Sequence, residues 1–407
     1  MSEATQGYAF GLIAIGAIII LSVVIRFASA KISLPVVVGY VLTGIVFSLI
    51  DAETELVSNT VRHGFGFLAE IGVIAILFRV GLESDLESLF KVLGKAFIVF
   101  ISNFVVAGAL GIAAILMFTD FGIVAALFVG AALSATSVGV STAMWRDAGV
   151  LETTSGALLV DVAELDDISA IIVLGLLFTL VPLMNGSGDA SIALALANES
   201  AVLLLKLGLF LAACYLFTRY LEEPLVGLFR TLDPQFGPML FAFGIALLVA
   251  AAADLLGFSL AIGAMFAGLA FSSPPTDRLV NHAFEQIYLL FSPFFFVSIG
   301  LAADVSAMSG AFALGGLLLV VAVAGKVLGT GLPILWLGPP GQSWLFGMSM
   351  VPRAEIALIV MSYGLSLGSW AVPPELYGAM LIVSLATCII GPLAVTQLLR
   401  KSDLTKL

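Results

Sequence analysis

Two adjacent carboxylates, Asp166 and Asp167, lie near the middle of an apolar segment that runs from residue 154 to residue 182. A helix of that length can cross the hydrocarbon core of a bilayer, which is roughly 30 Å thick. A charge at the bilayer centre costs at least about 2.5–3.5 kcal/mol on insertion scales, so such groups are functional candidates by default. Protons or a monovalent cation can neutralise the pair, and we predict that both bind there.

Lys326 lies in the middle of another apolar segment, within the run VAVAGKVLGTG, and no acid is near it in the sequence. A buried lysine must be paired or deprotonated. Adjacent helical residues point about 100° apart, so Asp166 can face Lys326 while Asp167 faces a cavity. We predict an Asp166–Lys326 pair in one state of the protein. Asn103 lies about 220 residues earlier, and we expect its side chain to form a hydrogen bond between two helices.

Two segments are expected to contain interrupted helices. Segment 122–145 carries the small, hydroxyl-rich run LSATSVGVS from Leu133 to Ser141. Segment 342–366 carries SMVPRAEIAL, in which Pro352 lacks an N–H and leaves a backbone carbonyl free. If the two interruptions cross, helix N-termini and free carbonyls meet near one point.

Four more charged residues flank these features. Arg353 and Glu355 follow the proline and are expected to form a structural clamp, to pair with Glu164, or to line a cytoplasmic funnel. Glu164 lies one turn before Asp167 and receives no firm role. Asp161 is nearer the inner end of its segment and is a candidate funnel acid.

The composition indicates an all-α polytopic membrane protein. Of 407 residues, 61% are hydrophobic and 11% are charged, whereas an ordinary soluble domain is about a quarter charged. This excludes a sizeable soluble domain. Cys214 and Cys388 lie in apolar runs and His63 and His282 are isolated, so neither a disulfide nor a resident metal is expected. A net charge of −11 argues against nucleic-acid binding.

We predict about 13 transmembrane helices. Their approximate limits are 8–28, 33–50, 64–82, 94–118, 122–145, 154–182, 199–221, 235–257, 259–274, 282–302, 310–335, 342–366 and 376–399. Lys and Arg mark the cytoplasmic side. Only Arg62 falls clearly on one side, whereas the other side holds Arg26, Lys31, Lys91, Lys95, Arg146, Arg219, Arg230, Arg278, Arg400, Lys401 and Lys406. The N-terminus is therefore expected outside and the C-terminus in the cytoplasm.

An internal repeat predicts the arrangement of these helices. GYVLTGIVFS from Gly39 is similar to GAMFAGLAFS from Gly263, and GLESD from Gly81 is similar to GLAAD from Gly300, at offsets of 224 and 219 residues. The copies begin seven spans apart, an odd number, so they have opposite topology. Inverted repeats of this kind, with crossing broken helices, are the plan of many secondary transporters.

The repeat divides a single transmembrane domain, residues 1–407, into four parts. We expect an extra N-terminal helix in 1–32, a first five-helix repeat in 33–182, linker helices in 199–257 and an inverted second repeat in 258–399. Binding sites in such folds lie near the bilayer midplane, at the interrupted helices.

An ordered set of motifs resembles the monovalent cation:proton antiporters. The motifs include AEIGVIAILFRVGLESD, SATSVGVSTAMWRDAGVLET, DD, PFFFVSIGLAAD, GKVLG and VPRAEIALIV. The likeness is greatest to the bacterial two-aspartate sodium/proton exchangers of the second cation:proton antiporter group, and it covers nearly the whole chain. It implies that Asp166 and Asp167 are the ion-binding pair, that Lys326 is the mid-membrane lysine, and that Thr136 and Ser137 stand at the break.

The resemblance also implies that the protein is a homodimer. It is expected in the cell membrane, specifically a bacterial inner membrane, where lipid surrounds it. Related potassium-efflux proteins often carry a soluble nucleotide-binding domain after the last span, and none is expected here because the chain ends at Leu407.

The predicted function is exchange of Na⁺ or Li⁺ for H⁺, serving pH homeostasis, and not catalysis by an enzyme. Burial disfavours a charged carboxylate and nearby cations favour it, so protons and Na⁺ compete for one site, with Na⁺ at Asp167 and the Thr136 or Ser137 hydroxyls. Partner exchange by Lys326 would make the transport electrogenic. No cofactor is expected. K⁺/H⁺ exchange, Na⁺-coupled symport of an organic anion, and an ion channel or a non-transporting sensor stay open as alternatives.

Overall fold

The structure is a computed structural model that describes residues 3–32, 34–54, 59–83, 94–137, 140, 144–145, 148–151, 153–184, 202, 205–206, 208–210, 212–256, 260–272, 276–303, 308–338 and 341–401. For some helical residues, Glu164 and Asp167 among them, it describes the backbone and not the side chain. Part of the expected span 199–221 lies outside these residues.

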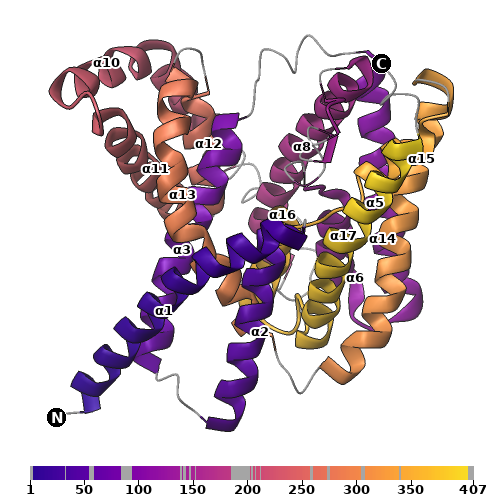
Figure 1. The fold of residues 1–407 in the computed structure, drawn as a ribbon, viewed down its shortest axis with the longest axis horizontal. Coiled ribbons are helices and arrows are strands. Elements are labelled where there is room, and N and C mark those ends of the chain that lie inside the picture. The colour runs from indigo at the N-terminus through magenta and orange to yellow at the C-terminus, as the bar shows by residue number, and fades with distance from the viewer. Residues whose placement is uncertain are drawn as a thin grey trace. The chain divides into compact units, whose positions relative to one another are not determined.

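The described residues form helices and no strands, which confirms the all-α prediction. The helices are α1 (Glu3–Ile32), α2 (Val36–Thr54), α3 (Asn59–Glu83), α5 (Lys95–Phe118), α6 (Gly122–Ser134), α8 (Thr154–Met184), α10 (Glu222–Leu232), α11 (Gly237–Leu255), α12 (Leu260–Ala270), α13 (Thr276–Leu301), α14 (Met308–Leu337), α15 (Ser343–Ser349), α16 (Glu355–Ser366) and α17 (Pro374–Lys401) (Figure 1).

Seven of the described helices are long and apolar enough to cross a membrane, and five shorter apolar helices accompany them. The protein is therefore a multi-pass membrane protein. Because these helix counts refer only to the described part of the chain, the total of 13 spans stays a prediction.

One helix, α10, was not expected. Residues 222–232 are more polar than the predicted spans, so their hydropathy does not predict a membrane-spanning helix. Glu222 and Glu223 lie in its first turn and Arg230 in its last, which is the charge order that stabilises a helix dipole. The prediction that no helix lies between residues 221 and 235 is therefore wrong.

The chain forms two compact units. Unit 1 comprises Met1–Leu21, Leu56–Leu86 and Gly175–Ser298, and unit 2 comprises Ser22–Glu55, Glu87–Leu174 and Ile299–Leu407. In unit 1, α12 packs against α3 and α11. In unit 2, α14 packs against α5, α15 and α17, and α5 also packs against α6.

The repeated motifs make the same contact twice. In unit 1, a Cβ on Gly81 would lie 2.1 Å from the carbonyl oxygen of Met265 in α12. In unit 2, a Cβ on Gly300 would lie 2.1 Å from the carbonyl oxygen of Val41 in α2. These partners are separated by the same offsets as the motifs, 219 and 224 residues. The recurrence is what a duplicated chain would produce, while the inverted relation of the copies stays a prediction.

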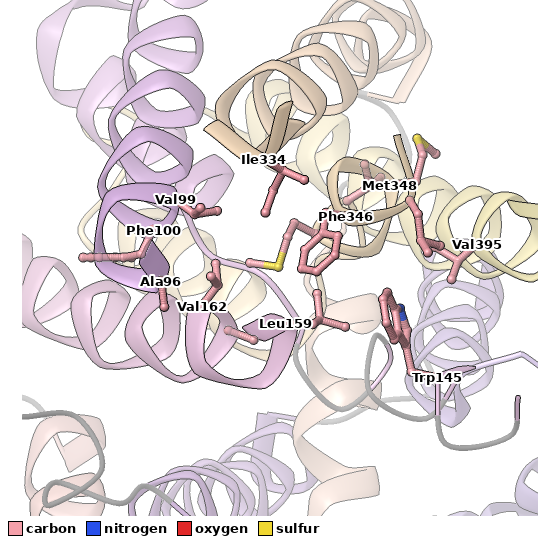
Figure 2. Packing of buried hydrophobic residues seen from close by; sticks show 14 of the residues in the cluster. Ala96, Val99, Phe100, Trp145, Leu159, Val162, Ile334, Phe346, Met348 and Val395 are labelled. Atoms are coloured by element: carbon pink, nitrogen blue, oxygen red, sulfur yellow. The ribbon is translucent and has the colours of Figure 1, made fainter. Parts of the chain in front are cut away.

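An apolar core in unit 2 joins α5, α8, α14, α15 and α17 (Figure 2). Its α8 members, Leu159, Val162, Ala163 and Leu165, directly precede Asp166. Trp145 is fully buried in this core, where its ring meets Phe346 edge-on and its Nε1 donates to Ser349 Oγ at 2.9 Å. The core thus fixes the stretch of α8 that leads to the carboxylate.

Candidate functional site

Two interrupted helices meet inside unit 2, as predicted. Helix α6 ends at Ser134, and Ala135 adopts extended backbone with φ −69° and ψ 147°. Between α15 and α16, residues 351–354 are not helical, and Pro352 lies among them. The backbone N–H of Ser137 donates to the Pro352 carbonyl at 2.8 Å. The Pro352 carbonyl, at one interruption, therefore receives its hydrogen bond from the other interruption.

Hydroxyl groups line this meeting point. Thr136 Oγ1 donates to the Met350 carbonyl at 3.3 Å, and Ser137 Oγ donates to Glu355 Oε2 at 3.1 Å. These oxygens, together with the carbonyls of the two breaks, are the ligand type that a hard monovalent cation prefers. Among the described residues no group of three or more His, Cys, Asp and Glu could hold a metal ion.

The expected pair of Asp166 and Lys326 is present. Lys326 Nζ lies 3.1 Å from Asp166 Oδ2, and both side chains are 0% exposed. Lys326 also donates to the carbonyl of Ser134, the last residue of α6. Carbonyls at a helix C-terminus lack intrahelical partners and carry partial negative charge, so this end of α6 is a second acceptor for the buried ammonium group.

The second oxygen of Asp166 is also occupied. Asn103 Nδ2, from α5, donates to Asp166 Oδ1 at 3.0 Å, and Thr330 Oγ1, from α14, donates to Asn103 Oδ1 at 3.1 Å. The helix–helix hydrogen bond of Asn103 was predicted from the sequence, whereas the part played by Thr330 was not. The available signal was the isolated amide in an apolar segment; nothing in the sequence distinguishes Thr330 from other threonines in spans.

Arg353 is a buried clamp. Its side chain is 0% exposed. The guanidinium donates to Leu133 O at 2.8 and 3.3 Å, to Ala322 O at 3.2 Å and to Val351 O at 2.8 Å. It therefore joins the end of α6, the middle of α14 and the interruption after α15. Of the roles that the sequence leaves open, this geometry fits the structural clamp.

Replacing Arg353 with lysine is expected to destabilise the protein. A lysine ammonium cannot reproduce the planar fork of a guanidinium. Each buried carbonyl left without a partner costs about 1–3 kcal/mol. The measurement is the thermal midpoint of the purified protein in detergent. Arg219→Lys, at an exposed position in unit 1, is the matched control, and an Arg353→Lys midpoint as high as that of the control would contradict the clamp.

The remaining predicted residues are placed as follows. Asp161 lies in α8 and is partly exposed. Asp167 and Glu164 are also in α8, and their side chains are outside the described part of the structure.

Nearly the whole chain matches the model of one protein family. The model of the family described as sodium/hydrogen exchanger, transmembrane, matches residues 17–401. The chain belongs to the sodium/hydrogen exchanger family. The family is one of transporters, and the monovalent cation:proton antiporter resemblance is thereby confirmed. Membership of the second cation:proton antiporter group stays a prediction.

Individual relatives agree with this assignment. The chain is 28% identical to a Na⁺/H⁺ antiporter of Enterococcus hirae, over 92% of this chain and 94% of the relative. It is 29% identical to the Na⁺/H⁺-K⁺ antiporter GerN of Bacillus cereus, over 89% and 90% of the two chains. The fold is similar to that of the sodium proton antiporter MjNhaP1 of Methanocaldococcus jannaschii, with a TM-score of 0.62 at 18% identity, covering 97% and 99%.

Proposed function

We propose that this family member exchanges Na⁺ for H⁺, with Li⁺ as an alternative cation, by alternating access. The observation that carries the proposal is the fully buried Asp166–Lys326 pair beside two facing helix interruptions. The names of the relatives in Enterococcus hirae and Bacillus cereus, which both include Na⁺ and H⁺, support exchange of these two ions. The activity is transport, and no bond-making chemistry or cofactor is assigned; Na⁺ and H⁺ are the cargo.

In this proposal protons and Na⁺ compete for the same carboxylates. Asp167 supplies the charged cation ligand, and Thr136 and Ser137 supply hydroxyl oxygens. Asp166 already has one oxygen on Lys326 and the other on Asn103, so its part is to hold or release the lysine. An empty, charged site is costly to carry across the membrane, which opposes leak.

The pair also sets the charge moved in each cycle. If Lys326 releases a proton when Na⁺ enters, two protons exchange for one Na⁺ and one net charge crosses the membrane. The membrane potential then contributes about 2.3 kcal/mol per charge for each 100 mV. We propose this electrogenic cycle because Lys326 is buried and has Asp166 as its ion-pair partner.

The proposed setting is a bacterial inner membrane, with the N-terminus outside and the C-terminus in the cytoplasm. The excess of Lys and Arg on one side of the predicted spans supports that orientation. A homodimer surrounded by lipid is the proposed assembly, and nucleic acid is not a partner. The organisation of the chain into two inverted repeats, 33–182 and 258–399, belongs to the same proposal.

K⁺/H⁺ exchange is the second candidate function. It is favoured by one observation, the name of the relative GerN, which is a Na⁺/H⁺-K⁺ antiporter. The hydroxyl and carbonyl oxygens at the breaks do not by themselves separate the two ions.

Proton flux reported by a pH-sensitive dye in proteoliposomes tests the proposal. Na⁺, Li⁺ and K⁺ are added in turn to vesicles that hold an imposed proton gradient. The expected result is cation-driven proton movement with Na⁺ and Li⁺, and little with K⁺. Flux that needs no opposing proton gradient would indicate a channel and overturn the exchange, and a response to K⁺ alone would favour the second candidate.

A further inference from the structure

Asp166 is held from two different helices. Lys326 on α14 contacts Oδ2 at 3.1 Å, and Asn103 on α5 contacts Oδ1 at 3.0 Å. All three side chains are 0% exposed. One partner is a charged ammonium group and the other is a neutral amide. An incoming cation repels the ammonium group, whereas it does not repel the amide.

Thr330 determines which way the amide of Asn103 faces. A side-chain amide has an acceptor on one side and two donors on the other. The Thr330 hydroxyl, itself fully buried, donates to Asn103 Oδ1, and this directs the Nδ2 donors toward Asp166. With the opposite orientation, the amide oxygen would face a carboxylate oxygen, and neither could donate.

The backbones of α5 and α14 approach closely enough for this contact. A Cβ on Gly329 would lie 2.9 Å from the Cα of Asn103, and a Cβ on Gly325 would lie 3.0 Å from the Cα of Ala107. The two glycines, one on each side of Lys326, therefore keep α14 against α5. Asn103 is thus fixed by backbone packing as well as by Thr330.

We propose that Asn103, oriented by Thr330, is a positioning residue of the exchange cycle that keeps the Asp166 carboxylate in place when Lys326 releases it. The inference rests on the proposed function, since only an exchange cycle requires that release. A buried carboxylate that loses its ion-pair partner is costly unless other donors remain. Asn103 is such a donor, and being neutral it does not compete with the incoming cation for charge.

The internal repeat places the two partners at matching positions. Asn103 precedes Lys326 by 223 residues, which lies between the two motif offsets of 219 and 224. Each copy of the repeat thus contributes one partner to the same carboxylate, the first a fixed neutral donor and the second a releasable cation.

Three variants test the inference in proteoliposomes. Asn103→Leu removes the amide, Thr330→Val removes the hydroxyl with little change of shape, and Thr330→Ser keeps it. In the cation-loaded state Asp166 depends on Asn103, whereas in the empty state it has both partners. Asn103→Leu is therefore expected to raise KM for Na⁺ about tenfold, the order of one hydrogen bond to a charged group, with kcat changed less than about threefold. Thr330→Val should raise KM by a smaller factor, and Thr330→Ser should restore it.

Tyr377→Phe is the matched control, because it removes another fully buried hydrogen bond of unit 2, from Tyr377 Oη to the Ile299 carbonyl at 3.0 Å. It should leave KM unchanged. If the unsubstituted protein exchanges Na⁺ and KM is unchanged in Asn103→Leu and Thr330→Val, or if kcat alone falls, the inference is overturned and the proposed function stands. Should Asn103→Leu fail to fold, the valine and serine variants at Thr330 decide. Absence of exchange in the unsubstituted protein would overturn the proposed function together with the inference.

Discussion

Replacing Asp167 with asparagine is expected to reduce Na⁺-driven proton movement to the level of protein-free liposomes. Both oxygens of Asp166 are engaged by Lys326 and Asn103, and the proposed function assigns to Asp167 the part of the carboxylate that neutralises the cation. An asparagine amide keeps the size of the side chain but can neither bind a proton nor balance the charge of Na⁺.

Dye-reported flux over a range of Na⁺ concentrations measures this effect. The control is Asp233→Asn in unit 1, a partly exposed position just after α10 whose Oδ1 accepts from the N–H groups of Gln235 and Phe236, because an asparagine oxygen can accept the same bonds. Ordinary exchange by the Asp167→Asn protein would place the cation site elsewhere. A fall of similar size in the Asp233→Asn protein would mean that the assay reports folding and not ion binding.

The second large effect is on the free energy of unfolding, and it comes from the Asp166–Lys326 pair. Asp166→Asn removes the ion-pair partner of the buried Lys326, and removal of one partner of a buried ion pair costs about 3–5 kcal/mol. Replacing both partners, as in Asp166→Asn with Lys326→Met, removes the stranded charge. We therefore expect the double variant to have a higher thermal midpoint than Asp166→Asn.

The thermal midpoints of the two single variants, the double variant and the unsubstituted protein form the cycle that measures this coupling. Additive effects of the two substitutions would show that the side chains do not interact in the protein as purified. Transport gives a second readout: Lys326→Ala is expected to lose its response to an imposed membrane potential. A response like that of the unsubstituted protein would remove the lysine from charge movement.

The sequence by itself predicts the helical membrane class, the repeat offsets and the positions of both helix interruptions. These features depend on local physics. A long apolar segment has to be helical in lipid because its backbone groups need internal partners, and Pro352 cannot donate the bond that a continuous helix requires. The charge of Asp166 and Lys326 in mid-segment is equally visible, since burying either one alone is costly.

Only the tertiary structure decides which groups share the charge. Arg353 could have paired with an acid, yet it donates to three backbone carbonyls, because the end of α6, the middle of α14 and the interruption after α15 all present carbonyls within its reach. Asn103 and Thr330 meet across α5 and α14 because glycines bring two backbones together. Helix α10 was missed because its composition is that of an amphipathic surface segment. Sequence spacing determines which groups must avoid lipid; the crossing of helices determines which partner each of them finds.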